Sequence, residues 1–180
     1  MPHSPNAKPT STDEPTQHPG HWAGIDPNRA AVVMANSGET MTYGELEAVA
    51  NRLSHWFRQL GLRNGDHVAF CMENRLDYLA IMWGCHYAGL YYTALSSRLN
   101  VDESAYIVNN CGAKVFIASP QVAAVAVGIV ATTQDVLARL SVGGHIDGHT
   151  PLGDELQVMP TTPLENRIET NDMLYSSGTT

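Results

Sequence analysis

Residues 42–71 read TYGELEAVANRLSHWFRQLGLRNGDHVAFC and predict a helix, a turn and a strand in succession. Thr42 and Glu45 have the spacing of a capping box, in which each side chain satisfies a free backbone N–H at the start of a helix. Apolar residues then recur at steps of three and four, and Gly61 stands where a glycine usually ends a helix. We therefore expect a helix from Tyr43 to about Leu60. His67–Cys71 is apolar without alternation after its first residue, which is typical of a strand buried on both faces.

The same rhythm continues on both sides of this stretch. The expected elements are a hairpin over Ala31–Met34 and Thr40–Tyr43, a helix from Leu76 to near Gly89, a strand over Leu90–Leu95, a helix opened by Asn100 with Glu103 and closed by Gly112, and a strand over Lys114–Ala118. Helices that alternate with short strands indicate an α/β fold with a mostly parallel sheet, flanking helices and right-handed crossovers.

Beyond Pro120 the pattern weakens. We expect helical segments over 122–130, 134–140 and 152–158, and an irregular connector over 159–171. A new strand over Asp172–Tyr175 then runs into the last five residues.

Composition excludes several classes of protein. The chain has 180 residues and a net charge of −8, and it contains no run of Lys or Arg, so we expect no nucleic-acid partner. The most apolar stretch, 115–131, is broken by polar residues and by Pro120, which argues against a transmembrane segment. The three cysteines form no CxxC pair, so we expect reduced core thiols and a cytoplasmic location. Residues 1–21 are rich in proline and polar residues, so we expect a disordered leader followed by one ordered domain over 22–180.

The last five residues, Ser176-Ser177-Gly178-Thr179-Thr180, carry the clearest chemical signal. Small side chains let backbone N–H groups approach an anion, and hydroxyl groups add further donors. A strand that runs directly into such a loop is typical of a phosphate site. A polar C-terminal end without function is the alternative.

Several segments together resemble the adenylate-forming (AMP-binding) superfamily, and within it the fatty-acid and acyl-CoA synthetases. The resemblance extends from Trp22 to Thr180. Its motifs are Tyr175-Ser176-Ser177-Gly178-Thr179-Thr180, Met41-Thr42-Tyr43-Gly44-Glu45-Leu46, Asn51-Arg52-Leu53, Gly61 to Ala69, and Ala88-Gly89 with Ser97-Arg98-Leu99. Ala94 departs from the pattern, because the family usually has proline there.

The resemblance implies a parent reaction in which ATP activates a fatty acid to acyl-AMP, which then passes its acyl group to coenzyme A. It implies ATP, Mg²⁺ and coenzyme A as cofactors of the parent enzyme. Ser176, Ser177, Gly178, Thr179 and Thr180 would form the first part of its phosphate loop. The resemblance also implies an incomplete AMP-binding domain, cut inside this loop, and we identify no catalytic or metal-ligating residue in the chain. The chain has two lysines, Lys8 and Lys114, and neither is expected near the phosphates, so we predict no ligase activity of the chain alone.

Two other interpretations remain open at this point. The chain could be a non-catalytic binding module, or it could complement a separately encoded remainder of the enzyme. An apolar face left without a partner also predicts self-association. His145 and His149, near Asp147 and Asp154, could imitate a metal cluster, but a surface loop is the preferred interpretation. We expect structural roles for His55, His67 and His86.

Overall fold

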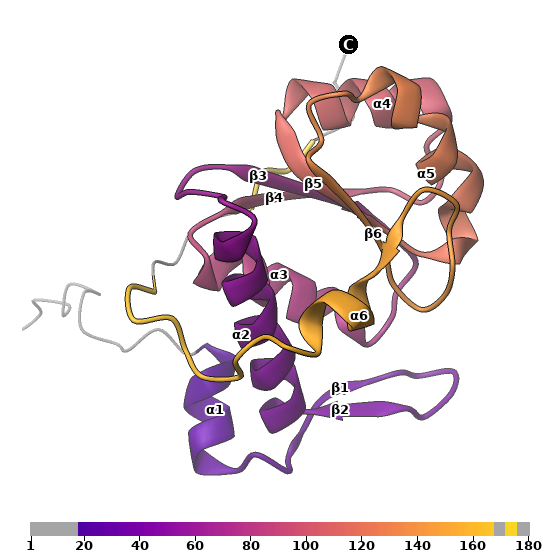
Figure 1. The fold of residues 1–180 in the computed structure, drawn as a ribbon. Helices are drawn as coiled ribbons and strands as arrows, with labels where there is room; N and C mark the ends of the chain where they lie inside the picture. The colour runs from indigo at the N-terminus through magenta and orange to yellow at the C-terminus, as the bar shows by residue number, and fades with distance from the viewer. Residues whose placement is uncertain (1–17, 168–171, 176–180) are drawn as a thin grey trace, which may run out of the picture.

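The computed structural model describes residues 18–167 and 172–175, which form three layers (Figure 1). The helices are α1 (Pro19–Ile25), α2 (Tyr43–Gln59), α3 (Asp77–Tyr87), α4 (Val101–Asn110), α5 (Ala123–Gly128) and α6 (Leu152–Leu156), with 3-10 turns η1 (Pro120–Val122) and η2 (Val130–Thr132). The strands are β1 (Ala30–Val33), β2 (Thr40–Thr42), β3 (His67–Cys71), β4 (Tyr91–Leu95), β5 (Ala113–Ala118), β6 (Ala138–Ser141) and β7 (Thr150–Pro151).

The main sheet has five parallel strands in the order β4-β3-β5-β6-β7, and β1 and β2 form a separate antiparallel hairpin. The predicted α/β class and parallel sheet are confirmed. The chain leaves β3 toward one side, to β4, and then returns past β3 to β5, after which each strand adds on that same side. Right-handed crossovers place the connecting helices on opposite faces when this direction reverses. In Figure 1, α4 and α5 cover one face of the sheet, and α2, α3 and α6 cover the other.

Local signals explain how α2 begins and ends. The Glu45 amide donates to Thr42 Oγ1 at 3.2 Å, and the Thr42 amide donates to Glu45 Oε2 at 2.8 Å, which confirms the capping box. Gly61 follows the helix with a φ of 92°, a conformation that L-residues with a side chain rarely adopt. Asn100 and Glu103 form the same reciprocal pair at the start of α4.

Alternate residues of the central strands supply two separate cores. Val68 and Phe70 of β3 face α2 and α3, together with Ile117 of β5. Ala69 of β3 faces α4 and α5, together with Phe116 of β5. All five side chains are fully buried, as expected for central strands covered on both faces.

Three expectations differ from the structure. Residues 134–140 are not helical, because 138–141 pair with β5 as strand β6, and the Leu137 amide donates to the Lys114 carbonyl at 2.8 Å. Backbone pairing with the open side of β5 therefore decides the conformation of 138–141, where the local sequence pattern is weak. Pro19–His21, the last residues of the expected leader, belong to helix α1, and residues 1–17 lie outside the described residues. The expected strand over Asp172–Tyr175 contains a single bridge, Tyr92 with Asp172.

Cys71, Cys85 and Cys111 are buried and free, as the sequence predicted. In the described ranges, none of the helices has the length and apolar character that crossing a bilayer requires.

Candidate functional site

The five residues predicted to bind phosphate, Ser176–Thr180, lie outside the described residues, but the segment that leads into them is placed. Asp172 forms a parallel bridge with Tyr92 of β4, and the Met173 amide donates to the Tyr92 carbonyl at 2.9 Å. Because the pairing is parallel, the chain from Asp172 runs toward the carboxyl end of β4. In open α/β sheets, ligands bind beyond the carboxyl ends of the strands. The predicted phosphate loop thus follows a segment that is directed to the functional end of the sheet.

Tyr175 is the last described residue before this loop, and a hydrogen bond holds its side chain against α4. Its hydroxyl donates to Asn110 Oδ1 at the end of α4, at 2.6 Å. Partial burial raises the pKa of the Tyr175 phenol, with smaller contributions from Cys111 and Tyr106. The phenol therefore stays protonated at neutral pH and acts as a hydrogen-bond donor.

A cavity of about 700 Å³ lies between β4, α4 and Tyr175. Its lining consists of Thr93, Ala94, Leu95, Ser96, Leu99, Asp102, Glu103, Tyr106, Ile107 and Tyr175. The lining has two carboxylates and no cation, and Glu103 is held in the α4 capping box. Such a cavity suits an apolar group better than a phosphate.

A cluster of polar side chains lies at the reversal point of the sheet. At this point the connections after β3 and β5 leave toward opposite edges of the sheet. Glu73 follows β3 and Ser119 follows β5, and the Ser119 hydroxyl donates to Glu73 Oε2. Arg75 Nη1 lies 2.9 Å from Glu73 Oε1, and Arg75 Nε lies 3.0 Å from Asp77 Oδ2. The crevice that often binds ligands in this fold is therefore bridged here by the protein's own side chains.

Electrostatics keep Glu73 ionised in this position. Burial alone pushes the pKa of the Glu73 carboxyl upward, but the hydrogen bond from Ser119 and the Arg75 guanidinium outweigh it and hold the pKa below its usual value. A carboxylate that is paired in this way acts as a structural anion rather than as a general acid at neutral pH.

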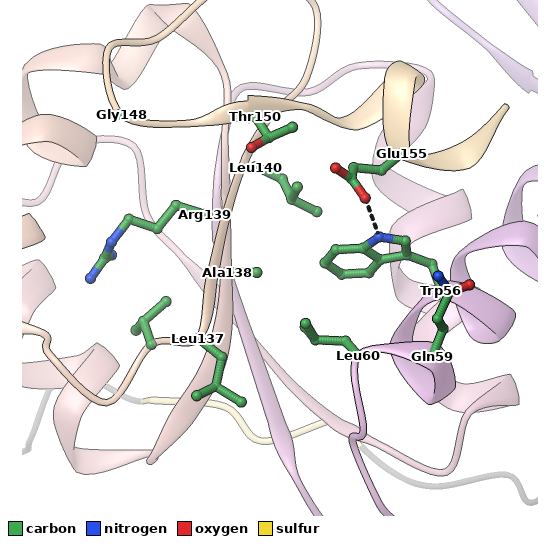
Figure 2. Close-up of a pocket in the computed structure, with 11 residues that line it drawn as sticks. Trp56, Gln59, Leu60, Leu137, Ala138, Arg139, Leu140, Gly148, Thr150 and Glu155 are labelled. Atoms are coloured by element: carbon green, nitrogen blue, oxygen red, sulfur yellow. Dashed lines mark hydrogen bonds between the residues drawn. The ribbon is translucent and has the colours of Figure 1, made fainter. Parts of the chain in front are cut away.

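Figure 2 shows a second cavity, of about 490 Å³, between the last turns of α2 and strands β6 and β7. The Trp56 indole Nε1 donates to Glu155 Oε2 at 2.7 Å and so fastens α6 to α2. Arg139 points away from Trp56 (Figure 2), and its guanidinium donates to the Thr133 carbonyl at 2.6 Å. Glu155 is hydrogen-bonded to Trp56, and Arg139 points away from Trp56. The cavity therefore brings together no reactive groups, and we interpret it as a gap in the packing.

The remaining sequence candidates have structural partners. His55 lies 2.8 Å from the Thr162 carbonyl, and His67 stacks on Tyr91. His145 pairs with Asp147 at 3.0 Å on the surface, whereas His149 is buried. Within 18–167 and 172–175, no three His, Cys, Asp or Glu side chains come together as a metal site would require.

Sequence reasoning did not single out Arg75, Ser119 or Tyr175 as site residues. Glu73 and Arg75 lie in the loop after the buried strand β3, and Ser119 directly follows β5. A polar residue just past the end of a predicted parallel strand is therefore the signal that could have found them.

Comparison with known proteins identifies relatives over most of the chain. The model of the family described as AMP-binding enzyme matches residues 20–180. A feruloyl-CoA synthase of Amycolatopsis is 35% identical over 168 residues, which are 89% of this chain and 31% of the relative. Human long-chain fatty acid transport protein 1 is 37% identical over 101 residues, which are 56% of this chain and 16% of the relative. The chain thus spans less than a third of the length of these relatives.

Solved structures share the fold. An anthranilate CoA ligase in complex with anthranoyl-AMP matches with a TM-score of 0.81 and 21% identity, over 90% of this chain and 32% of that one. A fatty acyl CoA synthetase of Mycobacterium tuberculosis matches with a TM-score of 0.75 and 23% identity, over 88% and 32% respectively. The fold is therefore that of part of an acyl-CoA synthetase.

Proposed function

The chain belongs to the family of AMP-binding enzymes, and we propose that it supplies an α/β layer and part of the phosphate loop to a fatty-acid–CoA ligase. In the complete reaction a carboxylate attacks the α-phosphate of ATP and releases pyrophosphate, and the thiol of coenzyme A then displaces AMP from the acyl-AMP. The parallel pairing of Asp172 with Tyr92 supports the proposal, because the chain leaves Asp172 in the direction of the carboxyl ends of the strands.

The proposed role of Ser176–Thr180 is to hold phosphate oxygens of ATP with backbone N–H groups and hydroxyls. Residues 22–180 would then form an incomplete AMP-binding domain. Mg²⁺ and coenzyme A would be bound mainly by residues that this chain does not contain. Free, buried cysteines support a reducing, cytoplasmic setting.

We propose that the chain alone does not form acyl-CoA. Phosphoryl chemistry needs cationic donors close to the developing charge. Lys114 is the second residue of β5 and so lies at the amino end of the sheet, whereas the chain leaves Asp172 in the direction of the carboxyl ends of the strands. Lys8, the other lysine, lies outside the described residues.

Complementation by a separate polypeptide is the second candidate, and an exposed surface favours it. Apolar side chains gather beside β4 and α4, and we call them the β4-edge surface: Tyr106 (64% exposed), Leu174 (75%), Met173 (38%) and Tyr175 (37%). Their proximity to one another is fixed by the Asp172 bridge and by the Tyr175–Asn110 hydrogen bond. Solvent-exposed apolar groups of this kind often mark a protein interface.

The test is ATP-dependent acyl-CoA synthesis by the purified chain, by a polypeptide that carries the family's sequence from the phosphate loop onward, and by the mixture. We expect activity in the mixture only. Activity of the chain alone would contradict the proposal that the reaction needs cationic side chains that this chain does not place near the phosphates. Silence of the mixture would contradict complementation.

A glycine variant connects this activity to the proposed loop. We expect Gly178→Ala to lower the rate of the mixture by about 10²-fold, because a Cβ would hold the backbone donors away from the phosphates. Gly24→Ala is the matched control, because a Cβ at Gly24 meets no atom within 4 Å. Equal rates for both variants would show that Gly178 does not approach the phosphates.

A further inference from the structure

A cavity of about 660 Å³ on the α2 side of the sheet has no role in the proposed reaction. It lies between α2, the start of α3, the loop after β6, and α6. Its lining is Val49, Arg52, Arg75, Asp77, Ser141, Val142, Gly143, Gly144, His145, Pro151, Leu152, Gly153, Leu156 and Gln157. Its volume is in the range of small-molecule sites, and we call it the Arg52 pocket.

Two guanidinium groups line the Arg52 pocket, in a chain whose net charge is −8. Arg75 is only 19% exposed and is held in place by its ion pairs with Glu73 and Asp77. Arg52 comes from α2 and is half-buried, and within 18–167 and 172–175 its side chain forms none of the ion pairs. Its Nε is buried without a hydrogen-bond partner in the same ranges. Asp77 is the only carboxylate in the lining, and Arg75 already pairs with it.

The loop after β6 approaches Arg75 closely because it contains glycine. Gly143 has a φ of 78°, and a Cβ at this position would overlap the Arg75 guanidinium. No backbone hydrogen bond in the described ranges uses the N–H groups of Gly143, Gly144 or His145. Successive backbone N–H groups of this kind form concavities that bind anions. Ser141, 2% exposed, adds a hydroxyl without a partner in those same ranges.

The remaining lining is apolar. Val49 of α2 and Leu152 and Leu156 of α6 lie in the wall of the same cavity. An inorganic anion would leave the apolar side chains of the cavity exposed to water. A neutral apolar molecule would leave Arg52 without a counter-charge. The combination selects a molecule with an anionic head and an apolar body.

We propose that the Arg52 pocket binds a small organic anion, a carboxylate or a phosphate monoester. Its head would lie between the Arg52 guanidinium and the backbone N–H groups of residues 143–145, and its body would lie against Leu152 and Leu156. The site is independent of the proposed ligase function, because it lies on the face covered by α2 and α6, whereas the cavity beside Tyr175 lies against α4.

The test is amide NMR of the intact chain titrated with hexanoate, hexyl phosphate, hexanol and inorganic phosphate. We expect hexanoate or hexyl phosphate to shift the amides of Gly143, Gly144 and His145, and to bind more tightly than hexanol or inorganic phosphate. The stronger of the two anions identifies the head group. The proposal is overturned if neither anion shifts these amides, or if hexanol binds as tightly as both.

Arg52→Gln separates a specific site from general attraction of anions. We expect the variant to weaken binding of the preferred anion about tenfold, the loss of one charge-assisted hydrogen bond. Arg63→Gln removes an exposed arginine outside the Arg52 pocket and should leave the affinity unchanged. Equal affinities of the two variants, with amide spectra that show both folded, would contradict the proposal.

Discussion

The two edges of the parallel sheet are finished in different ways. At the β6 edge, the two-residue strand β7 and helix α6 cover the sheet, and the Trp56–Glu155 hydrogen bond fastens α6 to α2. At the β4 edge, a single bridge at Asp172 is the pairing that the described residues provide, and apolar side chains lie exposed beside it. An edge strand with free backbone groups is a template for further pairing. The covered edge therefore contributes to stability, and we propose that the open edge receives further polypeptide.

The largest effect should come from the covered edge. Trp56 is 5% exposed and contacts Phe57, so Trp56→Ala removes a large buried side chain and also the bond to Glu155. We expect it to lower the free energy of unfolding by about 3–5 kcal/mol, measured by urea denaturation. Tyr106→Ala removes an aromatic side chain at the open edge and should change it by less than about 0.5 kcal/mol. Similar losses of unfolding free energy for both variants would contradict the claim that the two edges contribute differently to stability.

A smaller effect should come from pH. Burial lowers the pKa of His149, near the covered edge, from its ordinary value of 6.5. The unfolded chain therefore binds a proton more readily than the folded chain, and stability is lost as the pH falls below 6.5. We expect the melting temperature to decrease between about pH 6.5 and about pH 5.

His149→Gln should reduce this acid-induced decrease. Burial also lowers the pKa of His67, so part of the decrease should remain in the variant. A melting temperature that rises on acidification over this range would contradict the assignment, because it would require His149 to lose rather than gain proton affinity on unfolding.

The smallest effect on stability should come from Leu174→Ser on the β4-edge surface. Its side chain is 75% exposed, so we expect a change within about 0.5 kcal/mol. Self-association and binding of a hydrophobic dye should nevertheless decrease, because the exposed apolar area shrinks. Val158→Ser is a control, since Val158 is 82% exposed outside this surface. If both variants reduce association equally, the β4-edge surface has no special role.

Local sequence signals predicted part of the fold, whereas pairing between segments far apart in the sequence could not be predicted. The capping box of α2, Gly61 and the alternation of helices with buried strands are local signals, and the structure confirms each of them. Residues 134–140 were predicted as helix in a region where the sequence pattern is weak, and pairing with the neighbouring strand β5 explains why 138–141 extend instead. The short bridge at Asp172 likewise depends on β4, which lies far away in the sequence.

The candidate sites also differ in whether their residues are consecutive in the sequence or come from distant segments. The phosphate loop at Ser176–Thr180 stays a prediction: small residues and hydroxyls that follow one another in the chain indicate it, but these residues lie outside the described ranges. The Arg52 pocket could not be predicted, because Arg52, Arg75 and Gly143 come from three segments that only the folded sheet brings together. Ser119 and Glu73 meet for the same reason, across the reversal point between β3 and β5.

The most direct test of the open edge is pyrophosphate release by the mixture of the chain with the complementing polypeptide, using two variants at Met173. Met173→Pro removes the N–H that donates to the Tyr92 carbonyl, whereas Met173→Ala keeps it. We predict that Met173→Pro abolishes pyrophosphate release and that Met173→Ala retains it, because the backbone pairing directs the phosphate loop to the end of the sheet. Full activity of the Met173→Pro mixture would contradict that claim.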